Sequence, residues 1–145
     1  MATLLIVDDD SLIRETLHDL LSTSHECHTA DRAEQAFAYL EIENYDAVLT
    51  DLSMPGLSGR ELLNYIQDTH PATPVIVISG MPEGGYGQEV IEMGAFAFFR
   101  KPFKLEEIED AVERAIVRHQ ELTGSPHHED QPPNQPSPAD NDVSN

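Results

Sequence analysis

Residues 4–10 read Leu-Leu-Ile-Val-Asp-Asp-Asp, a run of four apolar side chains followed directly by three carboxylates. The apolar run does not alternate with polar residues, which is typical of a strand buried on both faces of a parallel sheet. Three consecutive carboxylates repel one another, so their position after a buried strand calls for a chemical reason. This stretch therefore predicts a parallel sheet that presents acidic groups at one edge.

The rest of the chain repeats this plan. Unbroken apolar runs also occupy residues 47–49, 75–78 and 96–99, and a weaker strand is expected at 26–29. Segments with helical spacing of apolar residues lie between these runs and after the last one. Five alternations of strand and helix predict an α/β domain with right-handed crossovers, in which helices cover both faces of a parallel sheet.

Several helix starts carry local signals. Asp31 with Glu34 and Ser58 with Glu61 have the spacing of a capping box, in which two side chains hydrogen-bond to free backbone groups of the first turn. Glycine and proline crowd residues 80–87, which predicts a poorly formed start for the fourth helix.

The amino-acid composition indicates the cellular compartment and the classes of binding partner to expect. The chain has 145 residues and no long apolar segment at its N-terminus, which favours one soluble domain without membrane insertion. Its single cysteine, Cys27, is expected to be a small buried side chain, which fits a reducing cytoplasm. Because 27 acidic residues outnumber 8 basic ones and give a net charge of −19, direct binding of nucleic acid is not expected.

The composition changes near residue 123. The last 23 residues contain five prolines and almost no apolar side chains, so they cannot bury enough surface to offset the entropy of ordering. We therefore expect a folded domain over residues 1–122 and a disordered, acidic, proline-rich tail over 123–145.

Polar side chains follow four of the five expected strands. Asp8–Asp10 follow the first strand and Asp51 follows the third, while Ser79 ends the fourth and Lys101 follows the fifth. In parallel α/β sheets, ligands bind beyond the carboxyl ends of the strands. Each residue alone has an ordinary interpretation, such as Asp10 capping the first helix, but the set predicts a site at this edge.

The carboxylates suggest a metal. Asp8, Asp9 and Asp51, brought together at one edge, would repel one another unless a cation lies between them. Hard oxygen ligands with open positions suit Mg²⁺, and the backbone carbonyl of Ser53 could complete the set.

The remaining groups suggest phosphoryl transfer. The Asp51 carboxylate can act as a nucleophile toward phosphorus and form an acyl phosphate. Such a reaction needs little beyond positioning and neutralisation of the phosphoryl oxygens. Mg²⁺, the Lys101 ammonium and the Ser79 hydroxyl could each serve one of those oxygens.

The complete set resembles the receiver domains of two-component response regulators, in particular the single-domain, chemotaxis-regulator-like ones. The resemblance covers roughly residues 3–119. It is carried by the following residues: Asp8-Asp9, Asp51, Met54-Pro55-Gly56, Gly59, Ser79 and Lys101-Pro102-Phe103. It implies a flavodoxin-like, doubly wound sheet of five parallel strands in the order 2-1-3-4-5, with five helices.

The resemblance also implies the roles of individual residues. Asp51 is the expected phosphoacceptor, and Asp8 and Asp9 are the acidic pair for Mg²⁺. Lys101 is expected to contact the phosphoryl group and to precede a cis peptide bond to Pro102. The switch residues are expected to be Ser79 and Phe98, where phenylalanine replaces the tyrosine of many members.

The function implied is that of a phosphoacceptor signalling domain rather than an enzyme, limited to self-catalysed phosphotransfer and autodephosphorylation. A sensor histidine kinase or a phosphotransfer protein would supply the phosphoryl group. Phosphorylation would switch a surface formed by the fourth and fifth strands and helices, which a downstream protein would read.

Two alternatives remain open at this stage. A degenerate receiver could keep the fold and act only as a binding module. A haloacid-dehalogenase-like phosphatase would also carry an Asp-x-Asp pair after its first strand, as Asp8 and Asp10 do, but it would have Thr or Val where this chain has Leu12. A dinucleotide-binding domain is disfavoured because no Gly-x-Gly-x-x-Gly follows the first strand.

Overall fold

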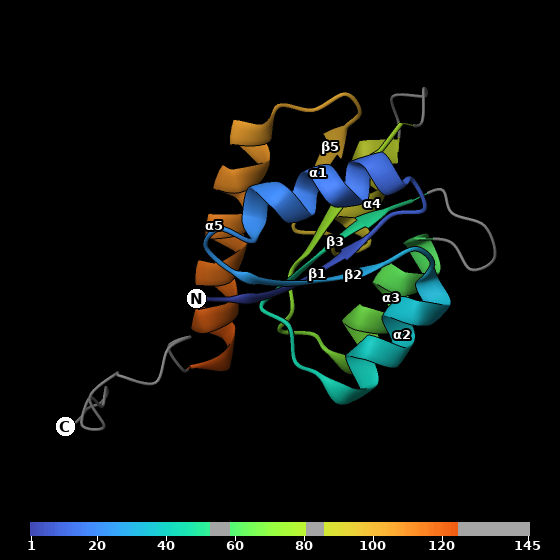
Figure 1. Ribbon diagram of the computed structural model, residues 1–145. Coiled ribbons are helices and arrows are strands. Elements are labelled where there is room, and N and C mark those ends of the chain that lie inside the picture. Colours follow the sequence, from blue (N-terminus) through green and yellow to red (C-terminus); the bar gives the residue numbers. More distant parts are fainter. Residues whose placement is uncertain (53–58, 81–85, 125–145) are drawn as a thin grey trace.

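The computed structural model describes residues 1–52, 59–80 and 86–124. They form an alternating series of strands and helices (Figure 1). In chain order these are β1 (Thr3–Val7), α1 (Ser11–Leu21), β2 (Glu26–Ala30), α2 (Ala33–Ile42), β3 (Ala47–Asp51), α3 (Gly59–Thr69), β4 (Val75–Ser79), α4 (Tyr86–Glu92), β5 (Ala97–Arg100) and α5 (Leu105–Thr123).

The strands form one parallel sheet in the order β2-β1-β3-β4-β5. The flavodoxin-like order 2-1-3-4-5 is therefore confirmed. Every residue of β3 and β4 is buried, and so are four of the five residues of β1, which is why most residues of these strands are apolar. The edge strands β2 and β5 are only partly buried, in keeping with their weaker sequence patterns.

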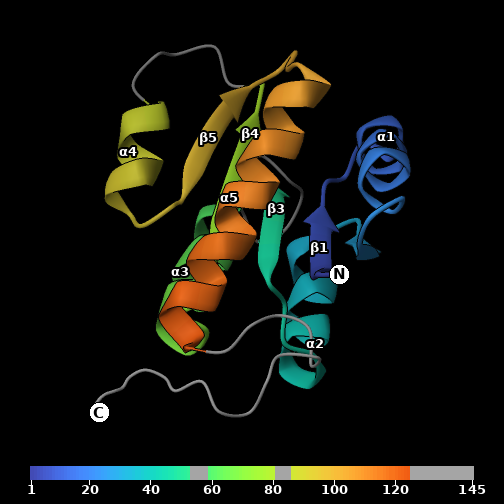
Figure 2. The same cartoon turned by 90° about the vertical axis from the view of Figure 1, so that its left-hand side faces the viewer.

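Helices cover both faces of the sheet (Figures 1 and 2). On one face, α1 and α5 pack against β1, β3 and β4 through an apolar cluster that includes Leu17, Leu49 and Val112. On the other face lie α2, α3 and α4, and their cluster includes Leu40 and Leu63. Because both faces are covered, the strand ends are where polar groups can reach solvent.

The prediction of a capping box at Asp31 and Glu34 is wrong. Helix α2 begins at Ala33, its N-cap is Arg32, and no side chain caps it. Gln35, one position after Glu34, instead accepts a hydrogen bond from the backbone N–H of Asp31 at 3.0 Å. The helix starts later than the box requires, so its third residue is glutamine. Ser58, of the second predicted box, lies outside the described residues.

Other boundaries differ by a residue or two. Strand β5 begins at Ala97 rather than Phe96, although the Phe96 N–H still donates to the Val75 carbonyl at 2.7 Å. Helix α5 runs through Thr123 and ends at Gly124, whose φ of 71° is the left-handed conformation that glycine adopts readily at a helix end. The remainder of the expected tail lies outside the described residues.

Cys27 lies half-buried in β2, and its side chain packs against the cluster beneath α1. Burial raises the pKa of the Cys27 thiol to about 11, so the thiol is neutral at physiological pH. No helix of the described ranges combines the length and the apolar character that crossing a bilayer requires.

Candidate functional site

The strand register brings the predicted residues to one edge of the sheet. Val7 lies beside Thr50, so Asp8 and Asp51 follow on adjacent strands. Asp51 in turn lies beside Ile78, the residue before Ser79. The backbone N–H of Lys101 donates to the Ser79 carbonyl at 2.8 Å, which extends the pairing of β4 and β5 to this edge.

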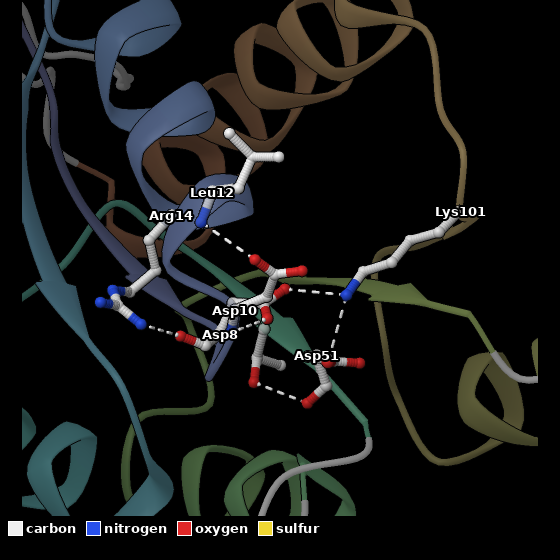
Figure 3. Close-up of polar contacts among 7 residues, drawn as sticks. Asp8, Asp10, Leu12, Arg14, Asp51 and Lys101 are labelled. Carbon is white, nitrogen blue, oxygen red and sulfur yellow. Dashed lines mark hydrogen bonds and ion pairs between the residues drawn. The ribbon is translucent and has the colours of Figure 1, made fainter.

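The Lys101 ammonium bridges two buried carboxylates (Figure 3). Its Nζ lies 3.1 Å from Asp8 Oδ2 and 3.2 Å from Asp51 Oδ2. The carboxylate side chains are only 3% and 6% exposed, against 22% for the lysine. The cation therefore holds together two acidic groups that would otherwise repel each other at the edge of a low-dielectric interior.

This environment shifts the pKa values of the groups. Burial raises the pKa of Asp8, an effect that outweighs the hydrogen bonds from the Asp10 N–H and Lys101. Burial alone would lower the pKa of Lys101, but its contacts with Asp8 and Asp51 outweigh that effect and raise it. Lys101 is therefore fixed in its charged form at neutral pH.

Asp9 adds a third carboxylate. One oxygen each from Asp8, Asp9 and Asp51 lies within 4.8 Å of the others, and Asp9 is exposed while the other two are buried. Oxygen ligands from two or three carboxylates, open to solvent on one side, match the preference of Mg²⁺ for few protein ligands and several exchangeable positions. The residues present therefore fit a magnesium ion.

Asp10 has a different role. Its side chain accepts a hydrogen bond from the Leu12 N–H at 2.9 Å and caps helix α1. Its backbone N–H donates to Asp8 Oδ1, also at 2.9 Å. Asp10 thus supports the position of Asp8 and the start of the helix, and its own carboxylate is outside the group of three.

Gly59 allows α3 to begin against the site. Its N–H donates to the Leu52 carbonyl at 3.0 Å. A Cβ at this position would overlap the Asp51 carbonyl oxygen and come within 2.7 Å of the Leu52 Cα. Only glycine permits this approach of the helix to the strand end that carries Asp51.

The two expected switch residues lie on neighbouring strands. Ser79 is completely buried at the end of β4. Phe98 is half-buried in β5 beside Val77, and its ring lies against Gly87 of α4, where an added Cβ would come within 2.9 Å of ring carbon Cδ2. The peptide bond between Lys101 and Pro102 is cis.

Two arginines near the site were not found by sequence reasoning. Arg14 Nη1 donates to the Asp8 carbonyl at 2.8 Å, and Arg60 reaches from α3 to Glu89 in α4. Neither contact is indicated by a spacing within one element, because each runs from a helix to a strand end or to another helix. Ser53, the expected carbonyl ligand, lies outside the described residues, as do Met54-Pro55-Gly56.

Comparisons with known proteins agree with this geometry. The family model of the response regulator receiver domain matches residues 4–113. The DNA-binding transcriptional regulator NtrC of Salmonella typhimurium is 36% identical over 117 residues, which make up 80% of this chain and 25% of NtrC. The chain thus spans about a quarter of the length of the curated relatives it matches.

Solved structures give the same result. A response regulator receiver domain protein from Clostridium thermocellum superposes with a TM-score of 0.78 at 30% identity, covering 84% of this chain and 99% of that one. The BeF3-activated DrrB receiver domain gives a TM-score of 0.76 at 26% identity, covering 81% and 98%. With its fold, its strand-end residues and these similarities, the chain belongs to the response regulator receiver domain family.

Proposed function

We propose that the chain accepts a phosphoryl group on Asp51, in a Mg²⁺-dependent reaction with a phosphohistidine of a sensor histidine kinase or phosphotransfer protein. The observation that carries the proposal is the Lys101 ammonium lying between the Asp8 and Asp51 carboxylates, with an Asp9 oxygen close by. A lone structural ion pair would need one carboxylate, whereas a phosphoacceptor site needs a nucleophile and a metal-binding pair beside it.

In the proposed reaction, an Asp51 carboxylate oxygen attacks the phosphorus and forms an O–P bond. The P–N bond of the phosphohistidine breaks, and the imidazole leaves with that electron pair. Asp8, Asp9, Asp51 and the Ser53 carbonyl would hold Mg²⁺, which would neutralise charge on the phosphoryl oxygens. Lys101 would move its contact from the carboxylates to a phosphoryl oxygen.

We further propose that Ser79 and Phe98 transmit the change. The Ser79 hydroxyl would turn toward the phosphoryl group, and Phe98 would turn into the space it leaves. Because the Phe98 ring lies against Gly87, its movement would alter the packing of α4 on β5. The surface of β4, α4, β5 and α5 would then be the one read by a downstream protein.

The test of phosphorylation is direct labelling. The chain is incubated with a small phosphodonor and Mg²⁺, and the modified residue is located by mass spectrometry after reductive trapping of the acyl phosphate. We expect label on Asp51, none in Asp51→Asn, and normal labelling in Asp10→Asn, because asparagine also caps a helix and Asp10 is outside the carboxylate group.

The outcomes separate the alternatives. Label on Asp8 would instead support a haloacid-dehalogenase-like phosphatase, and no label in the wild type would support a degenerate receiver that only binds. A pull-down that compares the phosphorylated wild type with Asp51→Asn then identifies proteins that bind the phosphorylated form.

The switch is tested separately by amide hydrogen exchange over residues 86–92, with and without beryllofluoride and Mg²⁺. We expect protection of α4 to change when the phosphoryl mimic binds. Identical protection in both states would contradict the role given to Phe98 and α4.

A further inference from the structure

The backbone carbonyl of Asp8 is held by a charged side chain. Asp8 follows the last residue of β1, and its N–H continues the pairing with β2 by donating to the Ala30 carbonyl at 3.1 Å. Its C=O accepts a hydrogen bond from Arg14 Nη1 at 2.8 Å (Figure 3). The Arg14 guanidinium, carried by helix α1, therefore takes the place of the backbone donor that a neighbouring strand would be expected to supply to this carbonyl.

This contact acts on the peptide that joins two carboxylate residues. The Asp8 carbonyl lies in the same peptide plane as the N and Cα atoms of Asp9. A hydrogen bond that fixes the direction of this carbonyl therefore also fixes the direction in which the Asp9 backbone leaves Asp8. Asp8 is additionally held through Oδ1 by the Asp10 N–H and through Oδ2 by Lys101. Exposed Asp9 has fewer constraints of its own, so its position depends strongly on this peptide.

The chemistry of the donor suits this role. Arg14 is half-buried on α1, and its guanidinium stays charged at any physiological pH. Hydrogen bonds from a charged donor are shorter and stronger than those from neutral groups.

We propose that Arg14 is a positioning residue, which orients the Asp8–Asp9 peptide so that both carboxylates face a divalent cation. The proposal rests on the proposed function, because it assumes that Asp8 and Asp9 bind Mg²⁺. Arg14 itself does not touch the metal or the phosphoryl group. Its loss should weaken Mg²⁺ binding and leave phosphoryl transfer intact once the metal is saturating.

The test compares Mg²⁺ affinity in the wild type, Arg14→Met, Arg14→Lys and Arg114→Met. Arg114→Met removes the same charge from an exposed pair with Asp110 on α5 and is the matched control. Affinity is measured by calorimetry, because the chain has no tryptophan to report binding by fluorescence. Metal-free amide NMR spectra of residues 8–12 report the peptide orientation independently of the metal.

We expect Arg14→Met to bind Mg²⁺ about tenfold more weakly, which is the low end of the cost of losing a partner that orients a metal ligand. Arg14→Lys should stay weaker than the wild type, and Arg114→Met should match it. The metal-free amide shifts of Asp9 and Asp10 should change only in the Arg14 variants. At saturating Mg²⁺, labelling of Asp51 by a small phosphodonor should return to within about twofold of the wild-type rate.

Three results would overturn the proposal. Wild-type affinity in Arg14→Met would show that the contact is incidental. Full affinity in Arg14→Lys, or an equal loss in Arg114→Met, would show that charge alone matters. If instead the wild type bound no Mg²⁺ and accepted no label on Asp51, the proposed function itself would be wrong. This result differs from a failure of the Arg14 proposal, in which the wild type binds Mg²⁺ and is labelled normally.

Discussion

Arg60 in the first turn of α3 and Glu89 in α4 form a bidentate ion pair. Arg60 Nη1 lies 2.6 Å from Glu89 Oε2, and Nη2 lies 3.0 Å from Oε1. Arg60 Nη1 also lies 3.8 Å from the sulfur of Met93, just beyond α4. Since Arg60 directly follows Gly59, which lies against the backbone of Asp51, the pair connects α4 with the helix start beside the end of β3.

Breaking this pair should loosen α4. The described part of α4 is only seven residues long, and a helix of that length is marginal without tertiary contacts. In Arg60→Met we expect faster amide exchange over residues 86–92 and little change in the thermal unfolding of the whole domain, because the pair is largely exposed. Arg114→Met, which breaks an exposed pair on α5, should leave α4 unaffected; equal exchange in the two variants would contradict this prediction.

The same pair should be visible in the titration of Glu89. The hydrogen bond from Arg60 lowers the pKa of Glu89 below its ordinary value of 4.5. A lowered pKa means that the stabilisation is present above pH 4.5 and is lost as the pH falls through the shifted value. Carboxyl NMR of Glu89 should show a midpoint below 4.5 in the wild type and one nearer 4.5 in Arg60→Met. Equal midpoints would exclude a persistent ion pair in solution.

Gly59→Ala should destabilise the domain and displace Asp51. The added methyl group would overlap the Asp51 carbonyl, so either α3 or the end of β3 must move. We expect a loss of about 2–3 kcal/mol in the free energy of unfolding, measured by denaturant titration, as for other overpacked sites. Gly80→Ala is the control, because among the described residues its Cβ would make only ordinary van der Waals contacts, with Lys101 Cδ at 3.8 Å and Lys101 Cβ at 3.9 Å. Equal stability of the two variants would refute the close approach.

The central fold was predictable because its signals are local. The unbroken apolar runs of β1, β3 and β4 reflect burial on both faces, so their positions were found almost to the residue. The start of β5 was not predicted correctly, because this edge strand is only partly buried. The cap of α2 was not predicted correctly either, because Arg32 occupies the N-cap position without a side-chain hydrogen bond. Local patterns are weakest where burial does not constrain the residue type.

The same distinction holds at the site. Asp8, Asp51, Ser79 and Lys101 could be grouped because each lies at the end of a strand, and parallel strands end at one edge. Arg14 and Arg60 could not, because their contacts run from a helix to a strand end or to another helix. Such contacts depend on how far apart the packed elements lie, which no spacing within one helix specifies.

The bridging position of Lys101 leads to a prediction that links stability to the metal. In Lys101→Met, the Asp8 and Asp51 carboxylates keep their burial but lose the cation between them. We expect the metal-free variant to be about 2 kcal/mol less stable than the wild type, less than the loss for a fully buried pair because Lys101 is partly exposed. Saturating Mg²⁺ should reduce this difference, since a divalent cation bound to the same oxygens replaces the missing charge and binds only the folded state.

The control is Lys104→Met, which removes an exposed lysine that makes no side-chain cap on α5 and should have little effect on stability with or without Mg²⁺. Denaturant titrations of the three proteins, each at zero and saturating Mg²⁺, measure the effect. The difference in the free energy of unfolding between Lys101→Met and the wild type should change on adding Mg²⁺ if Mg²⁺ and Lys101 bind the same carboxylates. A difference that Mg²⁺ leaves unchanged would mean that they do not. This result would contradict a magnesium site beside Asp8 and Asp51.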